Sequence, residues 1–315
     1  MPNKGMKHQN TTQLARTLYE QLPSLTQHGI KPSGLKGVSL FFQPHAFNHT
    51  KESTIYNPRM VILFSGAKIG ELGLRQFRYD AHHFLVLTSH YPLQCTTVCQ
   101  NDEDLLGMTI ELDREMVAQL IHDVRACEPH SYNQTTNQTD DQTHQNEGLA
   151  CYRMSETLRE RLHGLLSAMA NPMTCTLFGQ AQLRWFLYEF MSSSGQGFFE
   201  SWIQSNSQFQ QFHRVVEHIN ETFAEKISVA DLAHHAAMSE TKLNRLFKKY
   251  MADTPLQYLK KVRLHQARAF VVQKNMSIGL IAQKVGYESQ SQFCREFKRY
   301  FSKSPTEMAR AALHD

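Results

Sequence analysis

Polar and basic side chains recur at helical spacing in two stretches of the C-terminal third of this chain. Residues separated by three, four and seven positions share one side of an α-helix. Arg can form two hydrogen bonds with guanine, and Asn or Gln with adenine, in the major groove of DNA. For one helix alone, a charged face that meets only solvent is the alternative interpretation. The candidate base-reading and phosphate-binding residues are Thr241, Lys242, Asn244, Arg245, Lys248, Gln290, Ser291, Gln292, Cys294, Arg295 and Lys298.

These two stretches belong to an internal repeat. Leu232 and Ala233 match Ile281 and Ala282 at an offset of 49, so the turn of the second copy is one residue longer. A repeat with this shared shift indicates two copies of one structural unit. The pairs matched at an offset of 50 are Ser239 and Ser289, Arg245 and Arg295, Phe247 and Phe297, Lys248 and Lys298, Tyr250 and Tyr300, and Pro255 and Pro305.

Each copy has the pattern of a helix, a tight turn and a second helix. The first helices are predicted over Val229–His235 and Ile278–Lys284. Ser239 and Ser289 are placed to cap the second helices, and Gln292 completes a capping-box pattern in the second copy. The apolar residues of the second helices, which can point into the core of each unit, are Leu243, Leu246, Phe247, Phe293 and Phe297.

The residues between and after these helices support the same pattern. Gly286 suits the sharp turn of the second copy, and the turn of the first falls at Ala237 and Met238. After each copy a new helix is predicted to begin with an N-cap hydroxyl, a proline at the first helical position and Gln or Glu at the third. These starting residues are Thr254, Pro255 and Gln257, and Ser304, Pro305 and Glu307.

The positive charge of the chain lies in this region. Residues 209–315 contain 17 Lys and Arg against 10 Asp and Glu, whereas the other residues account for 16 of the 33 basic and 19 of the 29 acidic side chains. A basic region within a nearly neutral chain favours contact with a polyanion. Together with the repeat and its caps, this charge predicts that the two second helices bind double-stranded DNA.

The C-terminal sequence resembles the DNA-binding domain of the AraC/XylS family across its length. The resemblance is carried by SVADLAHHAAMSETKLNRLFKKYMADTPLQYLKKVRLHQARAFV and SIGLIAQKVGYESQSQFCREFKRYFSKSP. It implies two helix-turn-helix subdomains joined by a rigid helix at about 255–274, with reading helices roughly 34 Å apart on one face of DNA. Two positions where the family usually has glycine are Ala252 and Ser302 here, so we expect tighter or slightly strained turns.

The N-terminal part has a different pattern. A short helix is predicted over 11–22, followed by apolar runs separated by turn residues. Spacing and length favour a compact antiparallel sheet or barrel. Residues 128–148 are rich in Asn, Gln and Thr and are predicted to form a mobile loop. The runs predicted as strands are GVSLFF, RMVILFS, GLRQFRY, HFLVLTS and LLGMTIEL.

Two helices are predicted after this loop. The first has one apolar stripe. The second, over 177–191, has two: Leu183, Phe186, Leu187 and Phe190 on one side, and Phe178, Ala181, Trp185 and Tyr188 on another. One stripe can cover the sheet. The other is either buried within the same domain or forms the interface of a homodimer, and we place dimerisation within residues 151–193.

The segment IYNPRMVILFSGAKIGELGLRQFRYDAHHFLVLTSHYPLQ, with LLGMTIELD, resembles the cupin-like sensor half of a subgroup of these regulators. The resemblance implies a small β-barrel with a ligand cavity. Because side chains alternate along a strand, either Val61 and Leu63 or Met60, Ile62 and Phe64 face inward. We expect a largely apolar cavity that binds a small-molecule effector of unknown identity.

The barrel region also contains histidines and cysteines that could support other chemistry. Cupin folds also house metal enzymes, but adjacent His82 and His83 point to opposite faces of a strand, and no carboxylate completes a ligand set with His90. We therefore expect neither a metal nor a cofactor. Cys95 and Cys99 leave open a role in sensing an oxidant or electrophile.

Taken together, the sequence predicts an α+β protein, with a cupin-like β-barrel and flanking helices followed by an all-α domain of two helix-turn-helix subdomains joined by a linker helix. The predicted parts are a sensor and dimerisation domain (1–193), a linker (194–208) and a DNA-binding domain (209–315). We expect a ligand-responsive transcription regulator in the cytoplasm, without catalytic residues, which acts on double-stranded DNA and RNA polymerase. The alternatives are a cupin-type metal enzyme fused to a DNA-binding tail and a constitutive DNA-architectural protein.

Overall fold

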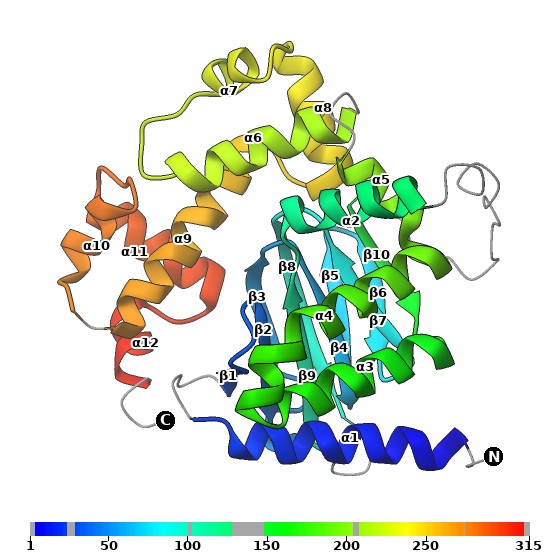
Figure 1. The fold of residues 1–315 in the computed structure, drawn as a ribbon. Helices are drawn as coiled ribbons and strands as arrows, with labels where there is room; N and C mark the ends of the chain where they lie inside the picture. The colour runs from blue at the N-terminus through cyan, green and yellow to red at the C-terminus, as the bar shows by residue number, and fades with distance from the viewer. Residues whose placement is uncertain are drawn as a thin grey trace.

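A computed structural model describes residues 4–23, 29–99, 103–127, 148–203, 208–273 and 275–311, with the side chains of 4–9 and 311 excepted. The loop predicted over 128–148 lies outside the described residues, apart from Gly148. Within the described ranges the chain forms a β-sheet domain followed by a helical domain (Figure 1). The predicted fold class is confirmed.

The N-terminal domain is built on one antiparallel sheet that curves into a half-barrel. Its strands follow the order β1-β2-β9-β4-β7-β6-β5-β8-β3, and β10 pairs with β7 outside this path. Five of the strands, β1, β3, β5, β8 and β10, were not among the predicted runs. The strands are β1 (Ile30–Pro32), β2 (Val38–Gln43), β3 (Lys51–Tyr56), β4 (Arg59–Ser65), β5 (Ala67–Leu72), β6 (Arg75–Asp80), β7 (His83–Leu87), β8 (Tyr91–Val98), β9 (Leu105–Glu111) and β10 (Leu149–Arg153).

Contacts between strands that are not neighbours define the interior face of the half-barrel. The hydroxyl of Thr97 on β8 donates to the side-chain oxygen of Gln43 on β2, at 2.9 Å. Phe41, on the same face of β2, lies over Gly107 together with Leu63. The structure therefore places Val61 and Leu63 inward, which decides between the two predicted alternatives.

Helices cover the other face and the ends of the sheet (Figure 1). The pair α3 (Glu156–Met169) and α4 (Pro172–Phe190) lies across the sheet, and α1 (Lys4–Gln21) runs beneath one end and contacts β2, β4 and β9. The helix α2 (Arg114–Cys127) lies at the opposite end. The short 3-10 helix η1 (His45–Phe47) follows β2.

The segment predicted as a linker over 194–208 is largely helical. The π-helical turn η2 (Met191–Gly195) continues α4, and α5 (Gln196–Ile203) follows directly. Phe199 and Trp202 of α5 are buried, with 0% and 1% of their surface exposed. This segment packs because its aromatic side chains have apolar partners in the sheet domain, whereas its Ser and Gly residues indicate a polar linker between two domains.

The C-terminal domain contains seven helices within the described residues. The predicted first helices of both repeat units, Val229–His235 and Ile278–Lys284, are confirmed residue for residue. The helices are α6 (Gln208–Thr222), α7 (Val229–His235), α8 (Glu240–Met251), α9 (Pro255–Gln273), α10 (Ile278–Lys284), α11 (Gln290–Phe301) and α12 (Pro305–Ala311).

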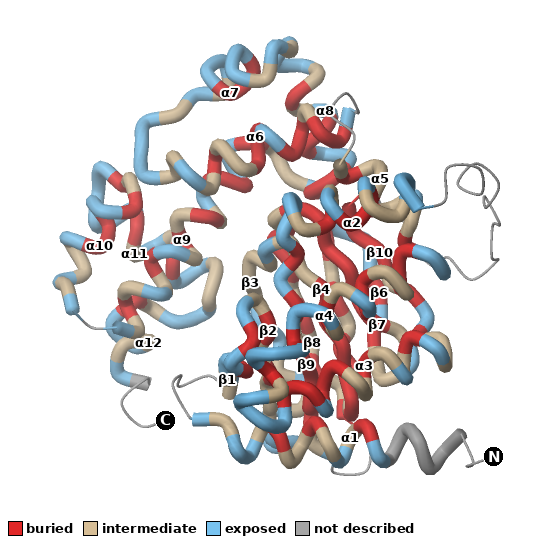
Figure 2. The backbone as a smooth tube through the Cα atoms, viewed as in Figure 1, coloured by how far each residue is buried: buried red, intermediate tan, exposed pale blue. Residues whose placement is uncertain are grey.

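Figure 2 marks the buried residues, whose apolar side chains form two clusters. The larger one runs without interruption from the sheet domain through α6, α7 and α8 to the first half of α9, ending at Val262. The smaller cluster contains the second half of α9 with α10 and α11, and includes Phe293 and Phe297. The core of the first helix-turn-helix unit is thus continuous with the sheet domain, while the second unit has a core of its own.

Candidate nucleic-acid interface

In the first unit, α7 and α8 form a helix-turn-helix with well-defined caps. Ser228 and Asp231 form a capping box at the start of α7, and Ser239 caps α8 by accepting a hydrogen bond from the Lys242 amide. The turn between the helices passes through Ala237, which has a left-handed backbone with φ of 50°. Leu243 is buried beneath α8.

In the second unit, α10 and α11 repeat this arrangement. Ser277 caps α10, and Ser289 caps α11 by accepting from the Gln292 amide. The side chain of Gln292 donates to Glu296 at 3.3 Å rather than to the N-cap, so the predicted capping box is only half formed. Gly286 has φ of 84°, which agrees with its predicted place in the turn.

The helices that follow each unit begin as predicted, and the turns before them are left-handed. Thr254 and Gln257 bond reciprocally at the start of α9, as Ser304 and Glu307 do at the start of α12. Ala252 and Ser302 end α8 and α11 with φ of 57° and 60°. A side chain in this region costs free energy that glycine does not, so the predicted strain is located at both turns.

The structure brings the predicted reading residues together on the outer faces of α8 and α11. Arg245 and Lys248 are exposed on α8, and Arg295 and Lys298 occupy the matching positions on α11. Thr241, Gln290, Ser291 and Gln292 are exposed as well, whereas Cys294 is half-buried.

Two of the residues predicted to contact DNA have side chains that form hydrogen bonds within the helical domain. The ammonium of Lys242 donates to Gln211 on α6 at 3.0 Å, and the Asn244 amide donates to the Glu240 carbonyl at 3.0 Å. Lys242 is therefore directed toward α6 rather than outward, and Asn244 must exchange its bond before it can reach a base. The two arginines and Lys248 and Lys298 remain the members best placed for contact.

The interior of the half-barrel carries more polar groups than the sequence indicated. Tyr79 donates to the thiol of Cys95 at 3.7 Å, and burial raises the pKa of both groups. Lys68 is 9% exposed, and its ammonium lies 5.6 Å from the centre of the Phe41 ring. Among the described residues, Lys68 has neither a hydrogen bond nor an ion pair.

The remaining candidate chemical groups of the sensor do not assemble into a reactive site. Cys95 and Cys99 are free and buried, and burial raises the pKa of each thiol, which disfavours the reactive thiolate at neutral pH. Asp80 accepts from the backbone amides of His82 and His83, whereas His90 lies toward the helical domain. Within the described ranges no three His, Cys, Asp or Glu side chains gather as metal ligands.

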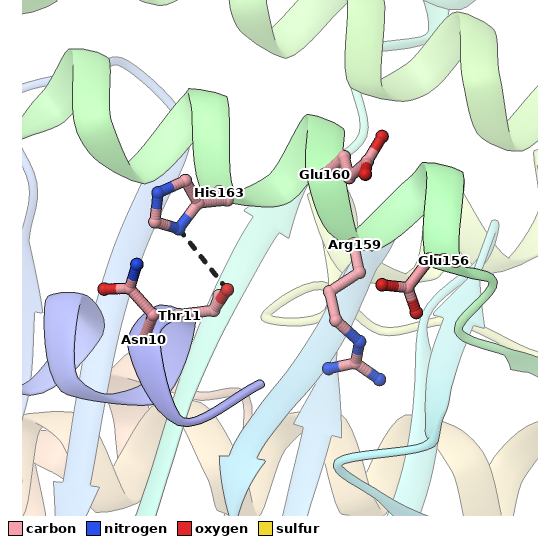
Figure 3. A pocket seen from close by; sticks show the side chains of 6 residues that line it. All are labelled: Asn10, Thr11, Glu156, Arg159, Glu160 and His163. Atoms are coloured by element: carbon pink, nitrogen blue, oxygen red, sulfur yellow. Dashed lines mark hydrogen bonds between the residues drawn. The ribbon is translucent and has the colours of Figure 1, made fainter. Parts of the chain in front are cut away.

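A pocket of about 250 Å³ lies outside the sheet, between α1 and α3 (Figure 3). Thr11 and His163 approach across it, with 3.4 Å between Oγ1 and Nδ1. Its other lining residues include both acidic and basic side chains, Glu156, Arg159 and Glu160. This mixed lining differs from the apolar cavity that was predicted within the barrel.

Several contacts join the helical domain to the sheet domain. His213 of α6 lies with Nδ1 2.9 Å from the hydroxyl of Ser89, and Tyr258 of α9 donates to the His90 carbonyl at 3.4 Å. Farther along α9, Arg268 donates to the carbonyl of Ser53 on β3 at 3.5 Å. These residues were not identified from the sequence, because each partner lies more than a hundred positions away.

Comparisons with known proteins identify the family. Residues 34–197 match the model of the AraC-type transcriptional regulator N-terminus, and residues 232–311 match that of a helix-turn-helix domain. This chain belongs to the AraC-type transcriptional regulators. No described helix has both the length and the apolar character needed to cross a membrane.

Individual relatives match less than a third of this chain. The probable transcriptional regulator LumQ of Photobacterium leiognathi is 35% identical over 89 residues, which cover 28% of this chain and 36% of LumQ. The bifunctional transcriptional activator and DNA repair enzyme AdaA of Bacillus subtilis is 33% identical over 91 residues, 29% of this chain and 43% of AdaA. The chain thus spans less than half the length of these relatives.

The whole fold has a match among solved structures. ToxT of Vibrio cholerae, in a structure with a bound unsaturated fatty acid, superposes with a TM-score of 0.57 at 14% identity. The alignment covers 86% of this chain and 94% of ToxT. At this identity the likeness shows the fold: a β-sheet domain followed by a helical domain with helix-turn-helix units.

Proposed function

We propose that this chain is a sequence-specific, DNA-binding transcription regulator. The observation that supports this function is the matched pair of α8 and α11, each capped by serine and anchored by buried aromatic side chains. Each exposes Arg and Lys at equivalent positions, within the basic third of the chain. In this proposal, residues 1–193 form a sensor, 194–208 connect it, and 209–315 bind successive major-groove segments of double-stranded DNA.

Substitution of the two arginines tests this assignment. We expect Arg245→Ala and Arg295→Ala each to weaken specific binding by about 1–3 kcal/mol and to relax preference at one base pair. Lys248→Ala should weaken binding to all sequences alike and reduce the dependence of affinity on salt concentration. Binding is measured by selection from a random DNA library followed by titration at several salt concentrations.

Lys36→Ala is the control for lost charge, because Lys36 is exposed in the sheet domain, away from α8 and α11. The DNA affinity and base preferences of the Lys36→Ala variant should equal those of the unsubstituted protein. If both arginine variants retain the selected sequence and the original affinity, the assignment of α8 and α11 as reading helices is wrong.

We further propose that the effector is a small organic acid bound inside the half-barrel. The buried ammonium of Lys68 supplies a cation, and the hydroxyls of Tyr79 and Thr97 on the same face can orient a carboxylate. Phe41 and Phe77 pack over Gly107 and Gly70, so these rings are the groups that a ligand would displace. The fatty acid bound to ToxT belongs to this chemical class.

A matched pair of ligands tests the effector class. An unsaturated fatty acid should raise the melting temperature of the protein and change its affinity for DNA, whereas its methyl ester should do neither. Lys68→Met should lose the response to the acid while it retains DNA binding without ligand. An equal response to acid and ester, or an unchanged response of Lys68→Met, would exclude the carboxylate role of Lys68.

The contacts between the two domains supply a route from effector to DNA. Ser89 and His90 follow β7 and hold α6 and α9, and Ser53 on β3 holds α9 near the second unit. An effector changes DNA affinity only by its difference in affinity for two arrangements of sensor and reading helices. If a bound effector changes the curvature of the sheet, the first contacts to change are those of Ser53, Ser89 and His90 with α6 and α9.

The exposed side of α4 supports a homodimer. Phe178 and Trp185 are 55% and 46% exposed, and the guanidinium of Arg161 lies 3.7 Å from the Trp185 ring centre. The opposite apolar stripe of α4 is buried against the sheet domain. We therefore propose that the exposed stripe, with Phe178 and Trp185, packs against a second copy of the chain. Sedimentation should give a dimer, and Phe178→Ser with Trp185→Ser should give a folded monomer.

In the proposed role the chain catalyses no reaction, resides in the cytoplasm and contacts RNA polymerase when it activates transcription. Transcription in vitro with purified RNA polymerase and a selected DNA site distinguishes activation from repression. The metal-enzyme alternative predicts near-stoichiometric zinc, iron or nickel in the purified protein. Metal analysis of the full chain therefore separates that alternative from the proposed regulator.

A further inference from the structure

A half-buried arginine joins the two helix-turn-helix units at a point that the linker helix alone does not explain. Arg263 lies midway along α9 and donates from Nε to the Phe223 carbonyl and from a terminal nitrogen to the Glu225 carbonyl, both at 2.7 Å. These carbonyls belong to the loop between α6 and α7, which leads into the first unit. Hydrogen bonds from a guanidinium to carbonyls are charge-assisted and directional.

The turn of the second unit presses on the same loop. A Cβ atom at Gly286 would lie 2.6 Å from the Ala224 carbonyl oxygen and 3.0 Å from the Arg263 guanidinium carbon. Glycine is therefore required at Gly286 by close approach as well as by its positive φ. The side chain of Phe223 packs against both buried clusters.

Further contacts keep the second unit against this part of α9. The Tyr287 hydroxyl donates to Glu296 of α11 at 2.9 Å, and Lys260 of α9 donates to the same carboxylate at 2.9 Å. The Arg263 guanidinium carbon lies 6.0 Å from the centre of the Tyr287 ring. The loop 223–226, Arg263 and the turn 285–287 thus form one joint between the units.

We propose that Arg263 is a positioning residue that sets the separation and phase of the two reading helices, and thereby the spacing of the two DNA segments that the protein accepts. This inference rests on the proposed DNA-binding function. A helix fixes its own length, but each unit can still rotate about its contact with α9. The two hydrogen bonds of Arg263 hold one unit by its backbone, and the same guanidinium contacts the turn of the other.

The test uses the full chain and DNA carrying the two selected sequence blocks. Base pairs are inserted or removed between the blocks, and affinity is compared with that for each block alone. The unsubstituted protein should lose at least about tenfold in affinity when two base pairs are inserted, because both helices cannot then reach their grooves. In Arg263→Ala this penalty should fall to about twofold, with the affinity for each single block unchanged.

Arg263→Lys keeps the charge and the aliphatic stem but cannot reproduce the planar fork, and is expected to relax the spacing too. Gln266→Ala is the matched control, because Gln266 lies on the same helix and its side chain is exposed. It should retain the spacing preference.

The outcomes separate the inference from the proposed function. If the unsubstituted protein selects no two-block DNA sequence, the proposed function fails. If it does, and the Arg263 variants keep its tenfold penalty, the positioning role is wrong. Equal losses for single blocks and for the complete site would also overturn it, because they would indicate general destabilisation of the domain.

Discussion

The two helix-turn-helix units share a sequence skeleton but differ in what surrounds their cores. The core of the first unit is continuous with the sheet domain through α6, and His213 bonds to Ser89 across the boundary. The second unit has a separate core and reaches the sheet domain through Arg268 and Ser53. The same motif is therefore held firmly by the sensor in one copy and loosely in the other, which makes the second unit the part more free to respond.

Truncation of the equivalent core aromatics should give the largest difference between the units. Phe247 and Phe297 are both 0% exposed, and replacing either with Ala should cost about 3–5 kcal/mol. Phe247→Ala should lower the unfolding midpoint of the sheet domain as well, whereas Phe297→Ala should unfold only the second unit. Hydrogen exchange across the whole chain measures both regions at once.

Leu165→Ala, in the sheet domain, is the control for this comparison. It should reduce protection in the sheet domain and in the first unit together, while the second unit stays protected. Equal loss of protection in both units after Phe297→Ala would contradict the separation of the two cores.

Acid should destabilise the molecule at two histidines, His90 at the boundary between the domains and His265 between α9 and α11. Burial, with the nearby His213 and Arg59, lowers the pKa of His90 to about 4, and burial beside Arg268 and Lys261 lowers that of His265 to about 3. Glu217 acts in the opposite sense on His90. Because the unfolded-state pKa is about 6.5, the unfolded chain binds more protons below that pH, and stability falls as pH decreases.

Between pH 7 and pH 5, each of these histidines should reduce the free energy of unfolding by about 2 kcal/mol. Urea unfolding at the two pH values measures the loss. His90→Gln should reduce the loss in the transition of the sheet domain, and His265→Gln in that of the second unit. A pH dependence that stays unchanged in His90→Gln would contradict the assignment of this loss to His90.

The sequence predicted the helical domain more completely than the sheet domain, for a physical reason. Caps, turns and the helical period are local, so the bounds of α7 and α10 follow from residues that are neighbours in sequence. Strands β5 and β8 were missed because Gly70 and Lys68 interrupt the apolar run of β5, and Pro92 is the second residue of β8. Their pairing is decided by partners elsewhere in the sheet.

The candidate DNA-binding site shows the same contrast between features that are local in the sequence and features that depend on tertiary packing. Periodicity identified the outward faces of α8 and α11, including Arg245 and Arg295. It did not show that Lys242 bonds to Gln211, nor that Arg263 reaches the loop before α7, because both contacts join residues more than 30 positions apart. Spacing within a helix predicts which side chains share a face, whereas the partner of a side chain depends on tertiary packing.

Placing glycine at the two left-handed turns should raise the free energy of unfolding, by less than the core substitutions lower it. Ala252→Gly and Ser302→Gly should each stabilise the chain by about 1 kcal/mol, because glycine adopts the φ of 57° or 60° without strain from a Cβ atom. Thermal unfolding measures the gain. Ala269→Gly, at an exposed helical position in α9, should be destabilising by a similar amount, since glycine there only adds freedom to the unfolded chain.

The smallest effect concerns the first helix of each unit. In α7 the carboxylate of Asp231 accepts a hydrogen bond from the Ser228 amide, whereas the matching position in α10 is Leu280, which is 50% exposed and cannot accept one. Leu280→Asp should complete a capping box with Ser277 and add a negative charge near the helix N-terminus, stabilising the second unit by about 0.5 kcal/mol. Leu280→Asn, which lacks the charge, should stabilise less. Hydrogen exchange in α10 measures the change, and unchanged or faster exchange in Leu280→Asp would show that capping is not what distinguishes the two units here.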